Sequence, residues 1–170
     1  MRIMGIDPGL ANIGYGVIEH SGQQSKMLVN GAIKTEAGTP LAQRLKQIHD
    51  ELLAVIEEWK PEVVCVEELF FCTNVKTAIS VAQGRGVCIL SSATANIPLA
   101  EYSPLEIKLA VVGYGKASKA QVLKMVKAIL GLQEIPATDH AADALAVALC
   151  HAHSQKFTSL VNKALLKRRR

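Results

Sequence analysis

Apolar residues follow two different spacings along the chain, and their order predicts its secondary structure. Short alternating or continuous apolar runs typical of strands cover residues 2–7, 13–18, 27–33, 63–67 and 98–102. Longer runs with one apolar residue every three or four positions, typical of helices, cover residues 40–59, 75–95, 104–112, 119–130 and 141–153. We therefore expect the order β-β-β-α-β-α-β-α-α-α.

This order predicts an α/β fold. Three strands joined by short links form an antiparallel meander, and later strands that follow helices add to the sheet in parallel. The continuous apolar run at 63–66 is typical of a strand covered on both faces. We expect a five-stranded mixed sheet flanked by helices, in a single domain over residues 1–154. Residues 155–170 have little apolar periodicity and are expected to form a flexible basic tail.

Three local signals refine the helices. Ser118 and Gln121 form a capping-box pattern, and Thr138 or Asp139 can cap the last helix. Gly84 and Gly86 lie inside a predicted helix, where each costs roughly 1 kcal/mol relative to alanine. Close approach of another backbone, such as that of a partner subunit, would explain both glycines.

The composition is that of a globular domain, with 49% hydrophobic and 20% charged residues. No apolar run approaches the ~20 residues needed to span a bilayer, and the start of the chain lacks a signal-peptide pattern. We expect a cytoplasmic location and no membrane partner. The cysteines lack the C-x-x-C spacing of zinc sites and are expected to be buried thiols: Cys65, Cys72, Cys88 and Cys150.

The formal net charge of +4 is unevenly distributed. The last 16 residues contain six basic residues and no acid, and without them the charge changes sign. Between Glu106 and Glu134 the only charged residues are five lysines: Lys108, Lys116, Lys119, Lys124 and Lys127. This stretch is a candidate phosphate-binding surface, and a solvated helix face explains the same pattern equally well.

Three acids stand in apolar surroundings. Asp7 and Glu67 each end a predicted strand, and Asp143 lies in an alanine-rich helix with His140 three residues before it. A carboxylate in such a position is costly unless a partner neutralises it. If the two strands are neighbours, the three acids can share one site, and carboxylates that share a site commonly share a cation. Oxygen ligands of this kind suit Mg²⁺ or Mn²⁺.

Such a site would have a defined chemistry. Two ions ~3.5–4 Å apart fit an in-line phosphoryl displacement, and His140 could bind an ion or orient a water. Each acid also has an ordinary structural explanation: Asp7 can bond to the following turn, Glu67 can be a strand-end charge, and Asp143 can pair with a lysine. Patterning leaves both explanations open.

At this point the chain resembles a known family, the RuvC-type crossover junction endodeoxyribonucleases or Holliday junction resolvases. The resemblance rests on these blocks: Gly5-Ile6-Asp7-Pro8-Gly9, Gly14-Tyr15-Gly16-Val17, Val66-Glu67-Glu68-Leu69-Phe70 with Asn74, Gln83-Gly84-Arg85-Gly86, Val111-Val112-Gly113 followed by Lys119, and His140-Ala141-Ala142-Asp143-Ala144-Leu145-Ala146. They occur in family order over about residues 3–151. The first block alone also resembles the start of actin-like ATPases, so the ordered set carries the resemblance.

The resemblance implies a ribonuclease H-like fold, a homodimer, and Mg²⁺-dependent resolution of four-way DNA junctions by paired symmetric nicks in recombination and repair. It also implies a partnership with the branch-migration helicase complex. Asp7, Glu67, His140 and Asp143 match the family's four catalytic and metal-binding positions. The third position is Asp in some members and His in others, so Asp139 competes with His140. A helix turns ~100° per residue, which places His140 nearer the face of Asp143.

Three further residues match family positions that contact DNA. Lys108 and Lys119 resemble lysines near the scissile phosphate, and Phe70 resembles an aromatic residue that meets bases at the junction centre. Phe70 can instead be a core residue, with Phe71 in its place at the junction.

Two alternative functions remain open at this level: a ribonuclease H-like nuclease acting on RNA, and a non-catalytic junction-binding protein. Pro8, the block around Phe70 and the chain length argue against the first, and the complete set of acids argues against the second. An actin-like ATPase would need two domains and a second phosphate loop.

Overall fold

The computed structural model describes residues 1–68, 75–134 and 138–168, with the side chains of 75–77 and 155–168 excepted. Its elements are β1 (Arg2–Asp7), β2 (Asn12–Ser21), β3 (Gln24–Lys34), α1 (Leu41–Trp59), β4 (Val63–Glu67), α2 (Val75–Thr94), β5 (Leu99–Tyr102), α3 (Pro104–Val112), α4 (Lys119–Leu130) and α5 (Asp139–Arg168). The expected order is confirmed. The last helix differs from the prediction, because it begins at Asp139 and continues beyond His153 through most of the range expected to be a tail.

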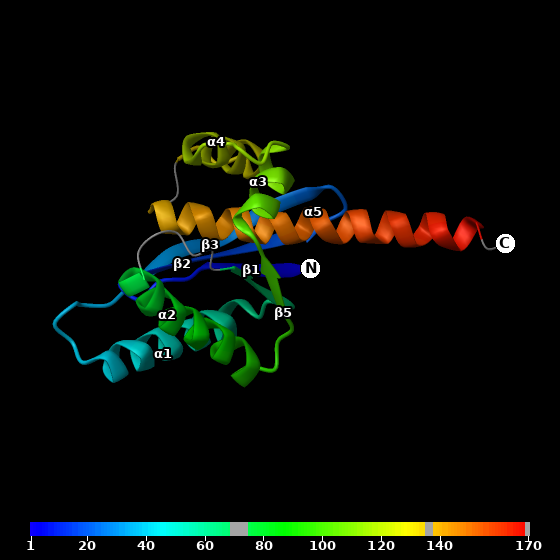
Figure 1. The fold of residues 1–170 in the computed structure, drawn as a ribbon. Coiled ribbons are helices and arrows are strands. Elements are labelled where there is room, and N and C mark those ends of the chain that lie inside the picture. The colour runs from blue at the N-terminus through cyan, green and yellow to red at the C-terminus, as the bar shows by residue number, and fades with distance from the viewer. Residues whose placement is uncertain (69–74, 135–137, 169–170) are drawn as a thin grey trace.

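The strands form the predicted five-stranded mixed sheet, in the order β3-β2-β1-β4-β5 (Figure 1). β2 is antiparallel to both β1 and β3, whereas β4 is parallel to both β1 and β5. The first strand of the chain therefore lies at the centre of the sheet, between an antiparallel and a parallel neighbour.

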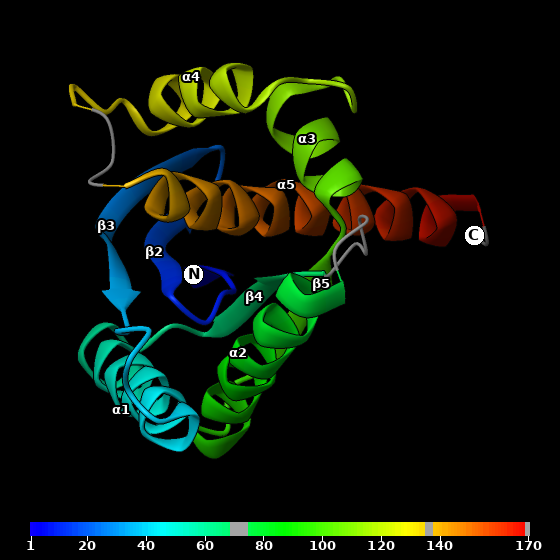
Figure 2. The same ribbon diagram turned by 60° about the vertical axis from the view of Figure 1, so that its left-hand side comes forward.

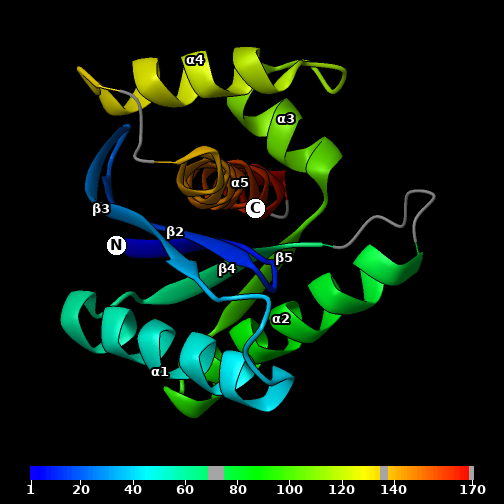
Figure 3. The same ribbon diagram turned by 90° about the vertical axis from the view of Figure 1, so that its left-hand side faces the viewer.

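Helices cover both faces of the sheet. α5 lies directly on one face with α3 and α4 outside it, and α1 and α2 cover the other face (Figures 2 and 3). Ile3 and Cys65 belong to the core on the α5 side, whereas Met4 and Val64 belong to the core against α1 and α2. Since side chains alternate along a strand, odd-numbered residues of β1 and β4 face α5.

Glycines in the central strands allow α5 to lie close to the sheet. A Cβ atom on Gly5 would lie 2.0 Å from the carbonyl oxygen of Ala144, and one on Gly14 would lie 1.9 Å from that of His140. A larger residue at either position would push the helix away. The glycines thus bring the first turns of α5 against the end of β1.

Helix-end signals agree with the sequence. Ser118 and Gln121 form the predicted capping box at α4. Thr138 is the capping residue of α5, because its hydroxyl oxygen accepts a hydrogen bond from the backbone N–H of Ala141 (3.1 Å).

The two helical glycines of α2 have different surroundings. A Cβ on Gly84 would lie 1.8 Å from the carbonyl oxygen of Gly9, whereas Gly86 faces open space. The expected close backbone is therefore present at Gly84, but it is the chain's own backbone and not that of a partner subunit.

Two further expectations concern the cysteines and membrane-spanning segments. Cys65, Cys88 and Cys150 are buried free thiols as predicted, and Cys72 lies outside the described residues. Among the described helices, none is long and apolar enough to cross a membrane.

Candidate active site

Two of the predicted acids lie side by side at the ends of the central parallel strands. Ile3 to Ile6 of β1 pair in register with Val63 to Val66 of β4, so Asp7 and Glu67 are the next residues on adjacent strands. Both are odd-numbered and point toward the α5 face. The side chain of Asp7 is only 15% exposed, which makes a partner for its charge necessary.

The first turn of α5 supplies that partner. Nδ1 of His140 donates a hydrogen bond to Oδ2 of Asp7 (2.6 Å). Asp143 lies three residues further along the same helix, and the carboxylate of Asp139 is 74% exposed. The structure therefore brings His140, and not Asp139, into contact with Asp7.

Lys119, at the start of α4, also reaches the site. Its Nζ lies 2.9 Å from Asp143 Oδ2 and 3.5 Å from Asp139 Oδ2. The hydrogen bond to Asp143 raises the pKa of Lys119, so this amine stays charged. The sequence left open that Asp143 pairs with a lysine. The structure contains this pair, with Lys119, and places it inside the candidate site.

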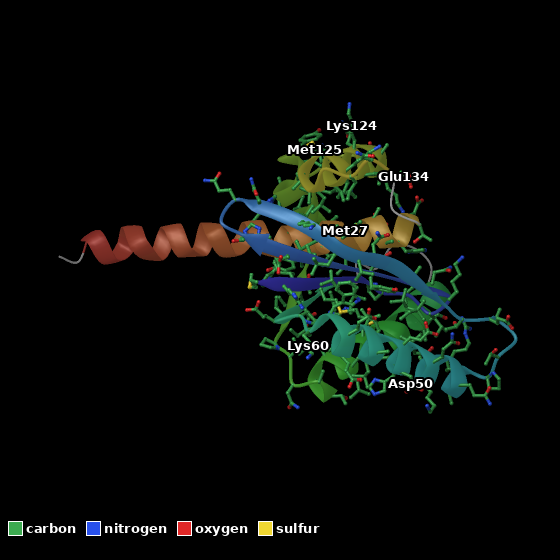
Figure 4. All side chains as sticks on the ribbon, turned by 180° about the vertical axis from the view of Figure 1, so that it is seen from behind. Met27, Asp50, Lys60, Lys124, Met125 and Glu134 are labelled. Atoms are coloured by element: carbon green, nitrogen blue, oxygen red, sulfur yellow. The ribbon has the colours of Figure 1, made fainter. Side chains whose placement is uncertain are left out.

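A pocket of ≈160 Å³ opens beside these groups. Its lining combines two carboxylates and two lysines with apolar residues: Glu67, Pro104, Ile107, Lys108, Lys119, Val122, Asp143 and Ala146. Lys124 is exposed and points away from the body of the protein on α4 (Figure 4). Of the five lysines between Glu106 and Glu134, Lys108 and Lys119 therefore line the pocket, whereas Lys124 is solvated.

The carboxylates raise one another's proton affinity. Burial, followed by the charges of Asp7 and Asp143, raises the pKa of Glu67 to about 7, against the opposing effect of nearby lysines. Burial also raises the pKa of Asp7, and the hydrogen bond from His140 opposes this. A bound cation would relieve the repulsion among these groups.

In the part of the chain that the structure describes, no three His, Cys, Asp or Glu side chains lie close enough to form a preassembled metal site. Asp7 is instead held by His140, and Asp143 by Lys119. The donor set still suits a hard divalent cation, because it consists of carboxylate oxygens and one imidazole. Phe70, and Phe71 as its alternative, lie outside the described residues.

One residue at the site was not assigned a role from the sequence. Nε of Arg85, on α2, donates a hydrogen bond to the backbone carbonyl oxygen of Glu67 (3.2 Å), and its guanidinium forms an ion pair with Glu101 of β5. The sequence feature that could have drawn attention to Arg85 is its position between two glycines in a helix of small residues.

Comparisons with known proteins agree with this geometry. Residues 3–151 match the family model described as crossover junction endodeoxyribonuclease RuvC. The curated RuvC of Syntrophomonas wolfei is 50% identical over 98% of this chain and 97% of its own length. That of Alkaliphilus oremlandii is 51% identical over 94% of this chain and 98% of its own length.

Solved structures give the same result. Thermus thermophilus RuvC in complex with Holliday junction substrate is 37% identical, with a TM-score of 0.89 over 93% of this chain and 96% of that one. The yeast mitochondrial Holliday junction resolvase Ydc2 shares the fold, with 16% identity and a TM-score of 0.65 over 91% of this chain and 78% of that one. On its sequence, fold and near-complete coverage, the chain belongs to the RuvC family of crossover junction endodeoxyribonucleases.

Proposed function

We propose that this chain is a structure-selective endonuclease that resolves four-way DNA junctions by paired symmetric nicks, acting in the cytoplasm in recombination and repair. The observation that best supports this function is that Asp7 and Glu67, at adjacent strand ends, lie beside His140 and Asp143 of α5. The Thermus relative bound to a Holliday junction substrate supports the choice of DNA.

The reaction we propose depends on Mg²⁺, with two ions per site and Mn²⁺ as a substitute. Nucleases of this family are metal-dependent in general. Asp7, Glu67, His140 and Asp143 would hold the ions, and a cation among them would relieve the repulsion that Asp7 and Asp143 exert on Glu67. Bound ions would activate the attacking water and stabilise charge on the leaving oxygen.

The chain's own residues have further roles in this proposal. Lys108 and Lys119 bind the phosphate near the scissile bond, because both line the pocket next to Glu67. With ions held by Asp143, the Lys119 amine would be available to the phosphate instead of to this carboxylate. The hydrogen bond between Nδ1 of His140 and Asp7 orients the imidazole ring, so that Nε2 is the nitrogen left for an ion or a water. Phe70 contacts bases at the junction centre.

We also propose a homodimer, since a two-fold protein can place one site on each of two opposed strands. α2 offers a face for it: Ile79 and Leu90 are more than half exposed, and Gly86 lies between them on the same side of the helix with open space around it. The family resemblance alone supports a partnership with the branch-migration helicase complex.

A substrate comparison tests the proposal. The purified protein is incubated with a labelled four-way junction, linear duplex DNA, an RNA–DNA hybrid and folded RNA, each with Mg²⁺ and with EDTA. We expect Mg²⁺-dependent nicking of the junction alone. Cutting of RNA would favour the related RNA nuclease, junction binding without nicking under any divalent ion would favour a binding protein, and equal cutting of linear duplex would exclude junction selectivity.

A further inference from the structure

Arg85 connects the ends of two strands beside the site. Its Nε donates to the backbone carbonyl oxygen of Glu67 at the end of β4, and its terminal nitrogen pairs with Glu101 of β5. The arginine side chain is 19% exposed and that of Glu101 is 41% exposed. A guanidinium can make both contacts at once because its donors lie in a rigid plane.

The residue before Arg85 fixes the position of the helix. Gly84 packs so closely on the loop after Asp7 that a Cβ atom there would lie 1.8 Å from the carbonyl oxygen of Gly9. One turn of α2 therefore touches the backbone that follows Asp7 and the backbone of Glu67 itself. These are the two strand ends that bring the first two carboxylates together.

We propose that Arg85 is a positioning residue for Glu67, which fixes the end of β4 so that the Glu67 carboxylate reaches the ions; this inference rests on the proposed function. Arg85 bonds to the backbone of Glu67, whereas Lys108 and Lys119 are the lysines that face its carboxylate in the pocket. The role of Arg85 is therefore geometric. The direction of the Glu67 side chain follows from the backbone that Arg85 holds.

A second described contact holds the same peptide unit, whose carbonyl Arg85 binds. Glu67 is the last residue of β4, and the ladder to β5 ends with the hydrogen bond from the N–H of Glu68 to the carbonyl oxygen of Tyr102 (2.8 Å). Loss of a group that orients a metal ligand typically lowers metal affinity or activity ~10–100-fold. We expect an effect of this size from a change at Arg85 that preserves its charge.

The test is Arg85→Lys, which keeps the positive charge and loses the planar fork. The matched control is Arg2→Lys: Arg2 also donates to a backbone carbonyl, that of Trp59 (2.9 Å), and also pairs with a glutamate, Glu19 (3.7 Å), but at the opposite end of β1. The melting temperature is recorded for each protein as a check on folding. Three functional quantities are then measured: junction affinity in EDTA, Mg²⁺ binding without DNA by calorimetry, and the cleavage rate as a function of Mg²⁺ concentration.

We expect Arg85→Lys to bind junctions with wild-type affinity and to lose ~10–100-fold in cleavage rate, with weaker Mg²⁺ binding. Arg2→Lys should match wild type in all three. The inference is overturned if Arg85→Lys cleaves and binds Mg²⁺ like wild type, or if its losses only follow a lowered melting temperature. Should Arg85→Lys not fold, Arg85→Gln, which keeps one donor for the carbonyl, is judged by the same readouts. Failure of the proposed function is distinguishable, because wild type itself would then not nick the junction.

Discussion

The perturbed carboxyl of Glu67 leads to a prediction about stability. Its pKa is raised to about 7 from an ordinary value of 4.5, mainly because it is buried near Asp7 and Asp143. The folded metal-free protein therefore favours the protonated form. Protonation of Glu67 therefore stabilises the folded protein relative to the unfolded chain. This stabilisation is fully present below pH 4.5 and is lost as the pH rises through 7, because the unfolded chain releases the proton first.

The size of the effect follows from the shift. At ~1.4 kcal/mol per pKa unit, the ionised Glu67 side chain costs the folded protein up to about 3 kcal/mol above pH 7. Glu67→Gln removes the charge and keeps the shape. We therefore expect it to stabilise the metal-free protein at pH 8 by up to about 3 kcal/mol, or ~6–12 °C in melting temperature, while abolishing cleavage.

Urea unfolding in EDTA at pH 8 and pH 4 measures this difference. We expect the variant to be more stable than wild type at pH 8 and equal to it at pH 4, where both side chains are neutral. Mg²⁺ at pH 8 should stabilise wild type more than the variant. Glu57→Gln is the control, since Glu57 is exposed on α1 and should gain nothing. Equal stability of wild type and Glu67→Gln at pH 8 would refute the reasoning.

Two other predictions concern a lysine and the helical glycines. Lys119→Ala should slow cleavage on the order of 10²-fold and reduce the salt dependence of junction binding by about one ion. Lys124→Ala, which changes an exposed lysine, should cleave normally. An unchanged cleavage rate in the Lys119 variant would show that the pairing of Lys119 with Asp143 is only structural. Gly84→Ala should destabilise the protein by ~1–3 kcal/mol because its Cβ meets the Gly9 carbonyl. Gly86→Ala meets no atom of its own chain and should gain ~0.5–1 kcal/mol when the protein is dilute enough to be monomeric. Denaturant midpoints under that condition test both, and equal effects would contradict the packing.

Local patterns and chain order were enough to predict most of the fold. The apolar spacings placed the order of the described strands and helices and most of their bounds. Parallel pairing of β1 with β4 made Asp7 and Glu67 neighbours, because the carboxyl ends of parallel strands meet at one edge. His140 was favoured over Asp139 by helical phase, and its contact with Asp7 spans 133 positions in the sequence.

The remaining features depend on contacts that no local pattern encodes. The role of Arg85 exists only because α2 lies against the ends of β4 and β5, and a guanidinium that reaches a carbonyl leaves no periodic signal. Close approach of a backbone at Gly84 was predicted with a partner subunit as one example, because spacing cannot tell one backbone from another. The extension of α5 beyond His153 was missed because residues 155–168 lack the apolar spacing that marks a packed helix.

The central claim is that the carboxylates at the strand ends hold the ions that cut a DNA junction. Asp7→Asn tests it most directly, because this change removes one negative charge beside His140 and leaves Lys108 and Lys119 in place. Junction binding in EDTA and nicking in Mg²⁺ are measured for wild type and the variant. We expect the variant to bind the junction like wild type and to leave it uncut; nicking at the wild-type rate would contradict the claim.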